Sequence, residues 1–136
     1  MDDELINAYL ETNYVVFVNE SEVVIKIGEQ LPKTLIDLLS NIESKSWAFI
    51  TAWNPSSQLT TDEINLQQNS QLFDEMSINY LILEGIGKSK DGNWSEASYF
   101  VVGISRSEAS EVGKKYRQNA ILYGEPEPEL MLLYDP

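Results

Sequence analysis

The sequence contains no cysteine and no histidine. Without cysteine the chain can form no disulfide, zinc ribbon or iron–sulfur cluster and offers no thiolate nucleophile. Without histidine it lacks the commonest general base and the commonest metal ligand. A Ser-His-Asp or Cys-His mechanism is therefore impossible in this chain alone, and acid–base chemistry would fall to glutamate.

Basic residues are scarce: nine lysines and arginines stand against 22 aspartates and glutamates, which gives a net charge of −13. Attachment to duplex nucleic acid or to anionic lipid needs a basic face, so we expect neither partner. Two interpretations of the acidity stay open. Either it only keeps the surface well solvated, or it meets a basic partner protein or mimics nucleic-acid phosphates.

Long hydrophobic runs are absent as well. No apolar stretch approaches the ~20 residues of a membrane helix, and the acidic start MDDELINAYLETN does not resemble a secretory signal. We therefore expect a cytoplasmic protein without membrane attachment. The length of 136 residues, 43% of them hydrophobic, predicts a single globular domain over residues 1–136.

Hydrophobic periodicity and turn residues predict four helices and seven strands. The helices are expected over residues 2–11, from Pro32 to Ile42, over 61–76, and from a Ser107 cap to Tyr116. The strands are expected over residues 14–18, 23–27, 47–53, 80–86, 97–105, 120–123 and 130–134. This order indicates an α+β fold, with a single mixed, mostly antiparallel sheet packed by three to four helices.

Two connections have specific signals. The strand over 47–53 is apolar on both faces, as in a central strand covered on both sides, and Asn54-Pro55 ends it. Asp91-Gly92 is a hairpin-turn signal between the strands over 80–86 and 97–105. Gly113 lies in mid-helix, which indicates a close backbone approach at that point.

The helix over 61–76 carries amides on the face that should meet the core. Its stripe reads Asp62, Asn65, Leu66, Asn69, Leu72, Phe73 and Met76. A buried amide without a partner costs on the order of 1–3 kcal/mol. Asn65 and Asn69 therefore either bond to backbone groups near Trp53-Asn54-Pro55 or line a cavity that admits water or ligand. The sequence leaves both interpretations open.

The start of this helix suggests a role for its polar residues. Thr60 and Glu63 have the spacing of a capping box, with a general base as the alternative role of Glu63. A helix N-terminus beside a strand end favours anions, so a carboxylate or phosphate ligand is expected there. Amides without clustered carboxylates bind metals poorly, so we expect no metal and no cofactor.

Four segments in order resemble a known family: AFITAWNPSS, TTDEINLQQN, GIGKSKDGNWSEASYFVVGIS and KKYRQNAILY. Together they look like the bacterial family catalogued as domain of unknown function 3293, over roughly Trp47 to Tyr123. The family's motif positions fall on Trp53, Asn54, Pro55, Asn65, Asn69, Trp94, Glu96, Ser98, Gln118 and Ala120. The chain departs from the family at Gln68, where arginine is usual, and at Arg117, where glycine is usual. The family has no established activity, so the resemblance implies a fold rather than a chemistry.

These observations predict a binding module for a small anionic ligand or a partner protein, with a polar pocket around residues 53–69. The ligand-binding candidates are Trp53, Asn54, Asn65, Asn69, Glu96, Arg117 and Gln118. Two alternatives are an enzyme that uses Glu63 or Glu96 as acid or base, and an acidic inhibitor that mimics nucleic acid. Structural roles stay open too: Trp53 and Trp94 in packing, Gln118 and Asn119 at a helix end, and Glu96 on the surface or paired with Arg117.

Overall fold

The computed structural model describes residues 3–134, in which seven strands form one sheet. The helices are α1 (Asp3–Glu11), α2 (Lys33–Asn41), α3 (Asp62–Ser77) and α4 (Arg106–Lys115), with a short 3-10 turn η1 (Pro55–Ser57). The strands are β1 (Asn13–Val18), β2 (Ser21–Ile25), β3 (Trp47–Ile50), β4 (Leu81–Lys88), β5 (Ser95–Val102), β6 (Ala120–Gly124) and β7 (Pro128–Leu132). The predicted order of helices and strands is confirmed, and so is the α+β class.

The sheet runs in the order β2-β1-β4-β5-β3-β6-β7, and each of its pairings is antiparallel. The prediction of a single, mostly antiparallel sheet is therefore confirmed, and the pairings between the described strands are all antiparallel. Hairpins account for much of the antiparallel pairing, since three of the pairs join strands that are consecutive in the chain: β1–β2, β4–β5 and β6–β7. The predicted turn at Asp91-Gly92 lies in the β4–β5 hairpin, where Gly92 has a φ of +78°. None of the helices between residues 3 and 134 is long and apolar enough to span a membrane.

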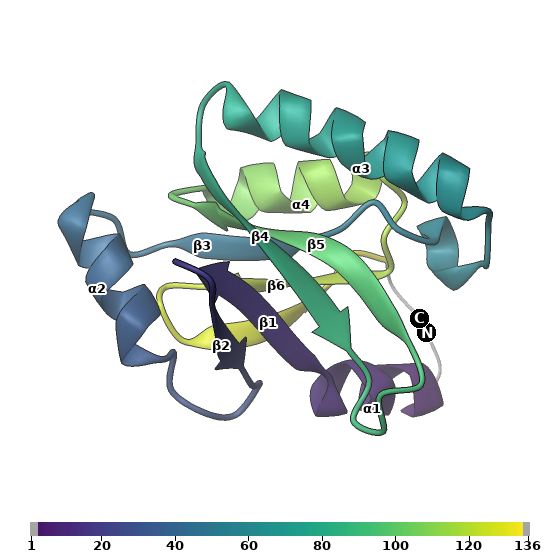
Figure 1. The fold of residues 1–136 in the computed structure, drawn as a ribbon, viewed down its shortest axis with the longest axis horizontal. Helices are drawn as coiled ribbons and strands as arrows, with labels where there is room; N and C mark the ends of the chain where they lie inside the picture. Colours follow the sequence, from purple (N-terminus) through teal and green to yellow (C-terminus); the bar gives the residue numbers. More distant parts are fainter. Residues whose placement is uncertain (1–2, 135–136) are drawn as a thin grey trace.

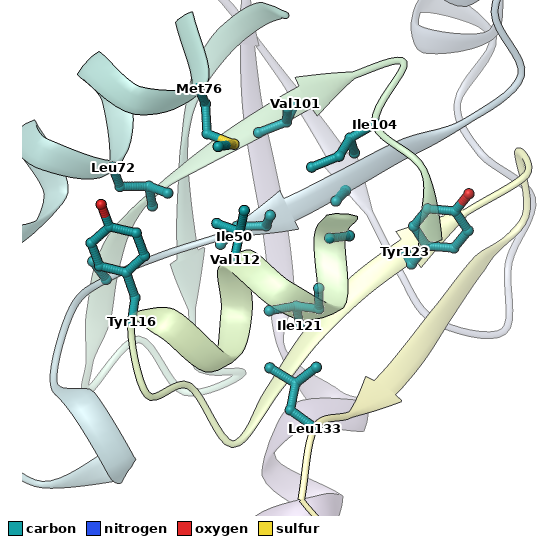
Figure 2. Close-up of a cluster of buried hydrophobic side chains, with 13 residues drawn as sticks. Ile50, Leu72, Met76, Val101, Ile104, Val112, Tyr116, Ile121, Tyr123 and Leu133 are labelled. Atoms are coloured by element: carbon teal, nitrogen blue, oxygen red, sulfur yellow. The ribbon is translucent and has the colours of Figure 1, made fainter. Parts of the chain in front are cut away.

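Strand β3 lies inside the sheet and is covered on both faces, as its composition predicted. Ala48 and Ile50 belong to one core cluster, and Trp47 and Phe49 belong to the other. Helices α3 and α4 lie over the first face (Figure 1). Figure 2 shows their side chains meeting the strands there, with Leu72 of α3 close to Ile50.

The second face is the concave side of a curled sheet. Leu35 and Leu39 of α2 pack against it, and the rings of Trp47 and Phe100 stack at 5.2 Å between centroids. Figure 1 shows α2 at one end of the sheet and α1 at the other, next to the turn of the β4–β5 hairpin. The apolar core thus fills the α2 end, and the end near α1 is left for polar side chains.

Strand β3 is shorter than predicted, because side chains replace its ladder hydrogen bonds after Ile50. The Thr51 hydroxyl donates to the carbonyl of Ala97 at 2.7 Å, and the Asn69 amide donates to the same oxygen at 2.8 Å. The next backbone N–H, that of Ala52, donates to Asn69 Oδ1 rather than to a strand. The sheet therefore ends where α3 begins to supply partners.

Both predicted helix caps are displaced. The hydroxyl of Thr61, not Thr60, accepts from the N–H of Ile64 at 3.1 Å, so the Thr60–Glu63 capping box is wrong. The Thr60 N–H is instead directed to Asn54 Oδ1 at 3.4 Å. In α4 the cap is Ser105 rather than Ser107.

The buried stripe of α3 is narrower than expected. Its buried members are Asn65, Asn69, Leu72 and Met76. Asp62 is exposed, Leu66 is 60% exposed and Phe73 is 38% exposed. Residues spaced alternately by four and three lie along one line, and Leu66 is about 100° around the helix from Asn65. The amides therefore lie at the centre of the buried face.

The close approach expected at Gly113 is confirmed. A Cβ at this position would lie 2.5 Å from Leu133 Cδ1 and 3.2 Å from Ile121 Cγ2. The helix α4 can therefore lie against β6 and the segment after β7 only because residue 113 has no side chain.

Candidate functional site

Asn54 and Asn65 bond to each other in both directions at the exit of β3. The backbone N–H of Asn54 donates to Asn65 Oδ1, and Asn65 Nδ2 donates to Asn54 Oδ1, both at 2.9 Å. Asn54 has a left-handed backbone with a φ of +45°, a conformation that asparagine tolerates better than most residues. Asn65 is only 1% exposed and Asn54 is half-buried, and the pair fixes the turn that follows the strand.

Asn69 occupies the next turn of α3 and is equally enclosed. Its Oδ1 accepts from Ala52 N–H at 2.8 Å, and its Nδ2 donates to the Ala97 carbonyl at 2.8 Å. Both asparagines thus use their amides on protein groups, as in the structural network that was one of the two interpretations. They tie α3 to β3 and β5 and carry the polar network toward the concave face.

Glu96 of β5 is the acidic end of this network. Asn54 Nδ2 donates to Glu96 Oε2 at 3.3 Å. Burial raises the pKa of the Glu96 carboxyl from 4.5 to about 7, and the hydrogen bond from Asn54 offsets part of that rise. Near neutral pH both protonation states are therefore populated, which is unusual for a glutamate.

Glu96 lines two neighbouring hollows. The inner one is a cavity of about 40 Å³ on the concave side of the sheet, and the outer one is a pocket of about 280 Å³ beside α1. Four residues line both: Tyr9, Trp94, Glu96 and Gln118. We call these four residues the Glu96 site. The inner cavity has room for roughly two or three water molecules, at about 15 Å³ each.

Gln118 contributes an acceptor that has no protein partner. Its Nε2 donates to the carbonyls of Trp53 and Tyr116, each at 3.3 Å, which fixes the orientation of the amide. The residue is 5% exposed, yet no enclosed side-chain polar atom between residues 3 and 134 lacks a partner. Its Oε1 must therefore be open to the hollows that Gln118 lines. This oxygen and the Glu96 carboxyl face the same space.

Gly87 makes room opposite Glu96. The two residues are paired across β4 and β5, and Gly87 lines the inner cavity. A Cβ at residue 87 would have one neighbour within 4 Å, Thr12 Cγ2 at 3.9 Å. A larger side chain at this register position would occupy the space in front of the carboxyl.

Five of the predicted site residues line neither hollow: Asn65 and Asn69, which belong to the network, and Arg117, Glu63 and Trp53. Arg117 is exposed and lines a separate groove beside η1 and the start of α3, and it forms no ion pair with Glu96. The proposed Glu96–Arg117 pairing is therefore wrong, and so is a freely exposed Glu96. Glu63 is exposed on the first turn of α3 and lines neither hollow. Trp53 joins the network through its backbone: its carbonyl accepts from Gln118 and its N–H donates to the Thr51 hydroxyl, while its side chain lines neither hollow.

Sequence reasoning missed the contribution of the N-terminal segment. Tyr9 of α1 lines both hollows, and Thr12 and Tyr14 line the inner cavity. Burial raises the pKa of Tyr9 and of Tyr14, so both phenols are neutral at physiological pH. Their place depends on the pairing of β1 with β4, which brings residues 9–14 beside Glu96, and the sequence did not predict the strand order.

The fold and the site define an α+β protein in which a polar network at a strand exit leads to a partly buried glutamate beside a hollow. The chain belongs to a protein family of unknown function (DUF3293), whose sequence model matches residues 50–121. That stretch contains Asn54, Asn65, Asn69, Glu96 and Gln118, and it leaves out α1 and β1. No curated protein matches the chain. No solved structure matches it either.

Proposed function

We propose that the protein binds a small molecule at the Glu96 site. The observation that supports this proposal is the pair of acceptors that share one hollow: the Glu96 carboxyl and the unpartnered Oε1 of Gln118. An acceptor that opens into a hollow and has no protein partner is free to take a hydrogen bond from water or from a ligand. A concave site with few polar groups that converge, one of them with a shifted pKa, is the usual form of a binding site.

The asparagine network supports this role indirectly. Asn54 holds the Glu96 carboxyl, and Asn65 in turn holds Asn54, so the carboxyl is attached to the rigid helix α3 through two side chains. Sites supported by a second layer of hydrogen bonds keep their geometry when a ligand enters. The predicted candidates Asn65 and Asn69 would thus position the site rather than touch the ligand.

A ligand screen tests the proposal. Thermal unfolding would be followed with a panel of amines, carboxylates, sugars and nucleosides, for the wild type and the Glu96→Gln variant. We expect at least one class to raise the melting temperature of the wild type and to lose most of that effect in the variant. The Glu63→Gln variant removes the same charge from outside the site and should respond as the wild type does. Responses that are flat across the panel would contradict the proposal.

A second candidate function, general acid–base catalysis by Glu96, has one observation in its favour. A carboxyl with a pKa of about 7 can both take and give a proton near neutral pH. A ligand from the screen would be incubated with the protein and followed by NMR for conversion. Catalysis requires a rate that depends on pH around 7 and that is lost in Glu96→Gln; an unchanged ligand leaves the protein a binding module.

The anion expected at the N-terminus of α3 would lie elsewhere, in the groove beside Arg117. No basic side chain lines the Glu96 site, so an anion there would meet a carboxyl without a counter-charge. The partner-protein and nucleic-acid-mimic alternatives stay predictions: the net charge of −13 favours them, and nothing in the structure tests them.

A further inference from the structure

We propose that the Glu96 site takes a small organic cation with N–H donors, with a primary ammonium group as its simplest form. This inference rests on the proposed function and names the chemical class of its ligand. The ammonium group would lie between the carboxyl of Glu96 and Oε1 of Gln118, with Trp94 and Tyr9 beside its carbon chain.

The hydrogen-bond inventory of the inner cavity supports a ligand that donates. Asn54 Nδ2 is used on Glu96, and Gln118 Nε2 is used on two carbonyls. The cavity hydroxyls that donate to backbone carbonyls belong to Thr12, Tyr14, Thr51 and Ser98. The acceptors left facing the hollow are therefore the Glu96 carboxyl and Gln118 Oε1, with the Tyr9 hydroxyl and the Trp94 indole N–H beside them. An ammonium group is a donor with no acceptor of its own, so it suits this pair of acceptors.

The charges around the site point the same way. Apart from tyrosines, the residues that line the two hollows include one titratable side chain, that of Glu96. Beyond Trp94, a neighbouring hollow carries Glu11, Lys90 and Asp91, two acids against one base. The chain as a whole has a net charge of −13, so its field attracts cations and repels anions.

Aromatic rings complete a cation site. Tyr9 and Trp94 line both hollows, and Trp94 is 40% exposed at the outer edge. The face of an aromatic ring attracts a cation within about 6 Å of its centre, most strongly for tryptophan. A large aromatic side chain that is exposed at the mouth of a polar hollow can therefore cover the ligand.

The proton balance follows from the state of Glu96. A neutral Glu96 carboxyl would release its proton to solvent when the cation binds, and the ammonium group would keep all its protons. With a pKa of about 7 in the free protein, the ionised fraction rises about tenfold between pH 6 and pH 8. Tyr9 and Tyr14 also face Glu96, but burial raises the pKa of both phenols above this range. The affinity should therefore rise about tenfold over the same interval.

Three probes of similar size, which differ in the charge of their end group, test the inference at equal ionic strength: n-butylammonium, n-butanol and butyrate. Binding would be followed by NMR through the Gln118 side-chain amide and the Trp94 indole N–H. We expect n-butylammonium to bind at least tenfold more tightly than either other probe, and to lose at least tenfold in Glu96→Gln. The Glu63→Gln variant, which removes an exposed carboxylate outside the site, should bind as the wild type does.

The outcomes separate this inference from the proposed function. If n-butanol or butyrate shifts the same two resonances and binds as tightly as n-butylammonium, the preference for a cation is contradicted. The proposal that Glu96 lies in a ligand-binding site would still stand. Binding of n-butylammonium that is insensitive to Glu96→Gln would place the cation elsewhere on the acidic surface and overturn the inference. No shift with any of the three probes would overturn it as well, and the proposed function would then depend on the wider ligand panel.

Discussion

Asn54 and Asn65 hold each other through two hydrogen bonds of 2.9 Å, one from a backbone N–H and one from a side-chain amide. The pair joins the left-handed turn after β3 to the first buried position of α3. Because the Asn54 side chain also donates to Glu96, the same two bonds set the position of the carboxyl at the site. The stability of the strand exit and the geometry of the site are therefore linked.

The Asn65→Asp variant should lose stability in a pH-dependent way. A carboxylate still accepts from the Asn54 N–H, but it cannot donate to Asn54 Oδ1, and it places a buried charge beside that oxygen. We expect a loss of about 3 kcal/mol or more at pH 7. The loss should shrink as the pH falls, because burial raises the pKa of the new carboxyl and its protonated form can donate again.

Urea unfolding at a series of pH values measures this effect. The matched control is Gln67→Glu, an exposed amide-to-carboxyl change two residues along the same helix, for which we expect a change within about 0.5 kcal/mol. Equal losses for the two variants would mean that the amide of Asn65 has no special role.

The Gly113→Ala variant should destabilise the protein although alanine is the better helix former. In an open helix the change would stabilise by about 1 kcal/mol. Here the new methyl would lie 2.5 Å from Leu133 Cδ1, so we expect a net loss of about 1–3 kcal/mol. In a Leu133→Ala background the loss should be smaller, which a double-mutant cycle measures. Strictly additive effects would contradict the close approach.

Two glycines of β4 should respond in opposite ways to alanine. At residue 85 a Cβ would lie 2.6 Å from the Val15 carbonyl oxygen, so Gly85→Ala should destabilise by roughly 2 kcal/mol or more. At residue 87 the nearest atom is 3.9 Å away, so Gly87→Ala should keep its stability. Because its methyl enters the inner cavity, it should weaken n-butylammonium binding several-fold. Unchanged binding would place the ligand outside the inner cavity.

The Glu96→Gln variant should change how stability depends on pH. The folded-state pKa of about 7 lies above the ordinary value of 4.5, so the folded protein holds a proton that the unfolded chain has lost over this window. Wild-type stability therefore falls as the pH rises from about 4.5 to about 7, by roughly 2–3 kcal/mol at about 1.4 kcal/mol per pKa unit. Glutamine stays neutral and should avoid this loss. The free energy of unfolding of the variant should therefore rise relative to that of the wild type as the pH increases to 8. A constant difference across pH would contradict a raised pKa.

Much of the fold was visible in local sequence patterns. Two-residue alternation in Trp47–Ile50 predicted a strand covered on both faces, and the amides at Asn65 and Asn69 predicted a polar junction at its end. These patterns depend on residues that are close in the sequence, so they can be recognised without knowledge of the tertiary structure. The C-terminal end of β3 and the cap of α3 were misplaced, because tertiary hydrogen bonds to Asn69 and Asn54 decide them. The cap of α4 was misplaced by two residues, at Ser107 instead of Ser105.

The composition of the site could not be predicted without the strand order of the sheet. Glu96 had appeared beside Arg117 as one of several polar candidates, and nothing local indicated that the two face different hollows. Tyr9 and Tyr14 reach the site because β1 pairs with β4 across about 70 residues of sequence. The free acceptor of Gln118 is visible only once the carbonyls of Trp53 and Tyr116 are seen to take both amide hydrogens.

A titration of the Glu96 carboxyl carbon by ¹³C NMR, with and without n-butylammonium, tests the central claim most directly. The account predicts a midpoint near pH 7 in the free protein and a midpoint at least one pH unit lower when the cation is bound, because the cation favours the ionised carboxyl. A midpoint near 4.5 in the free protein, or one that the cation leaves unchanged, would contradict the assignment of Glu96 as the centre of the site.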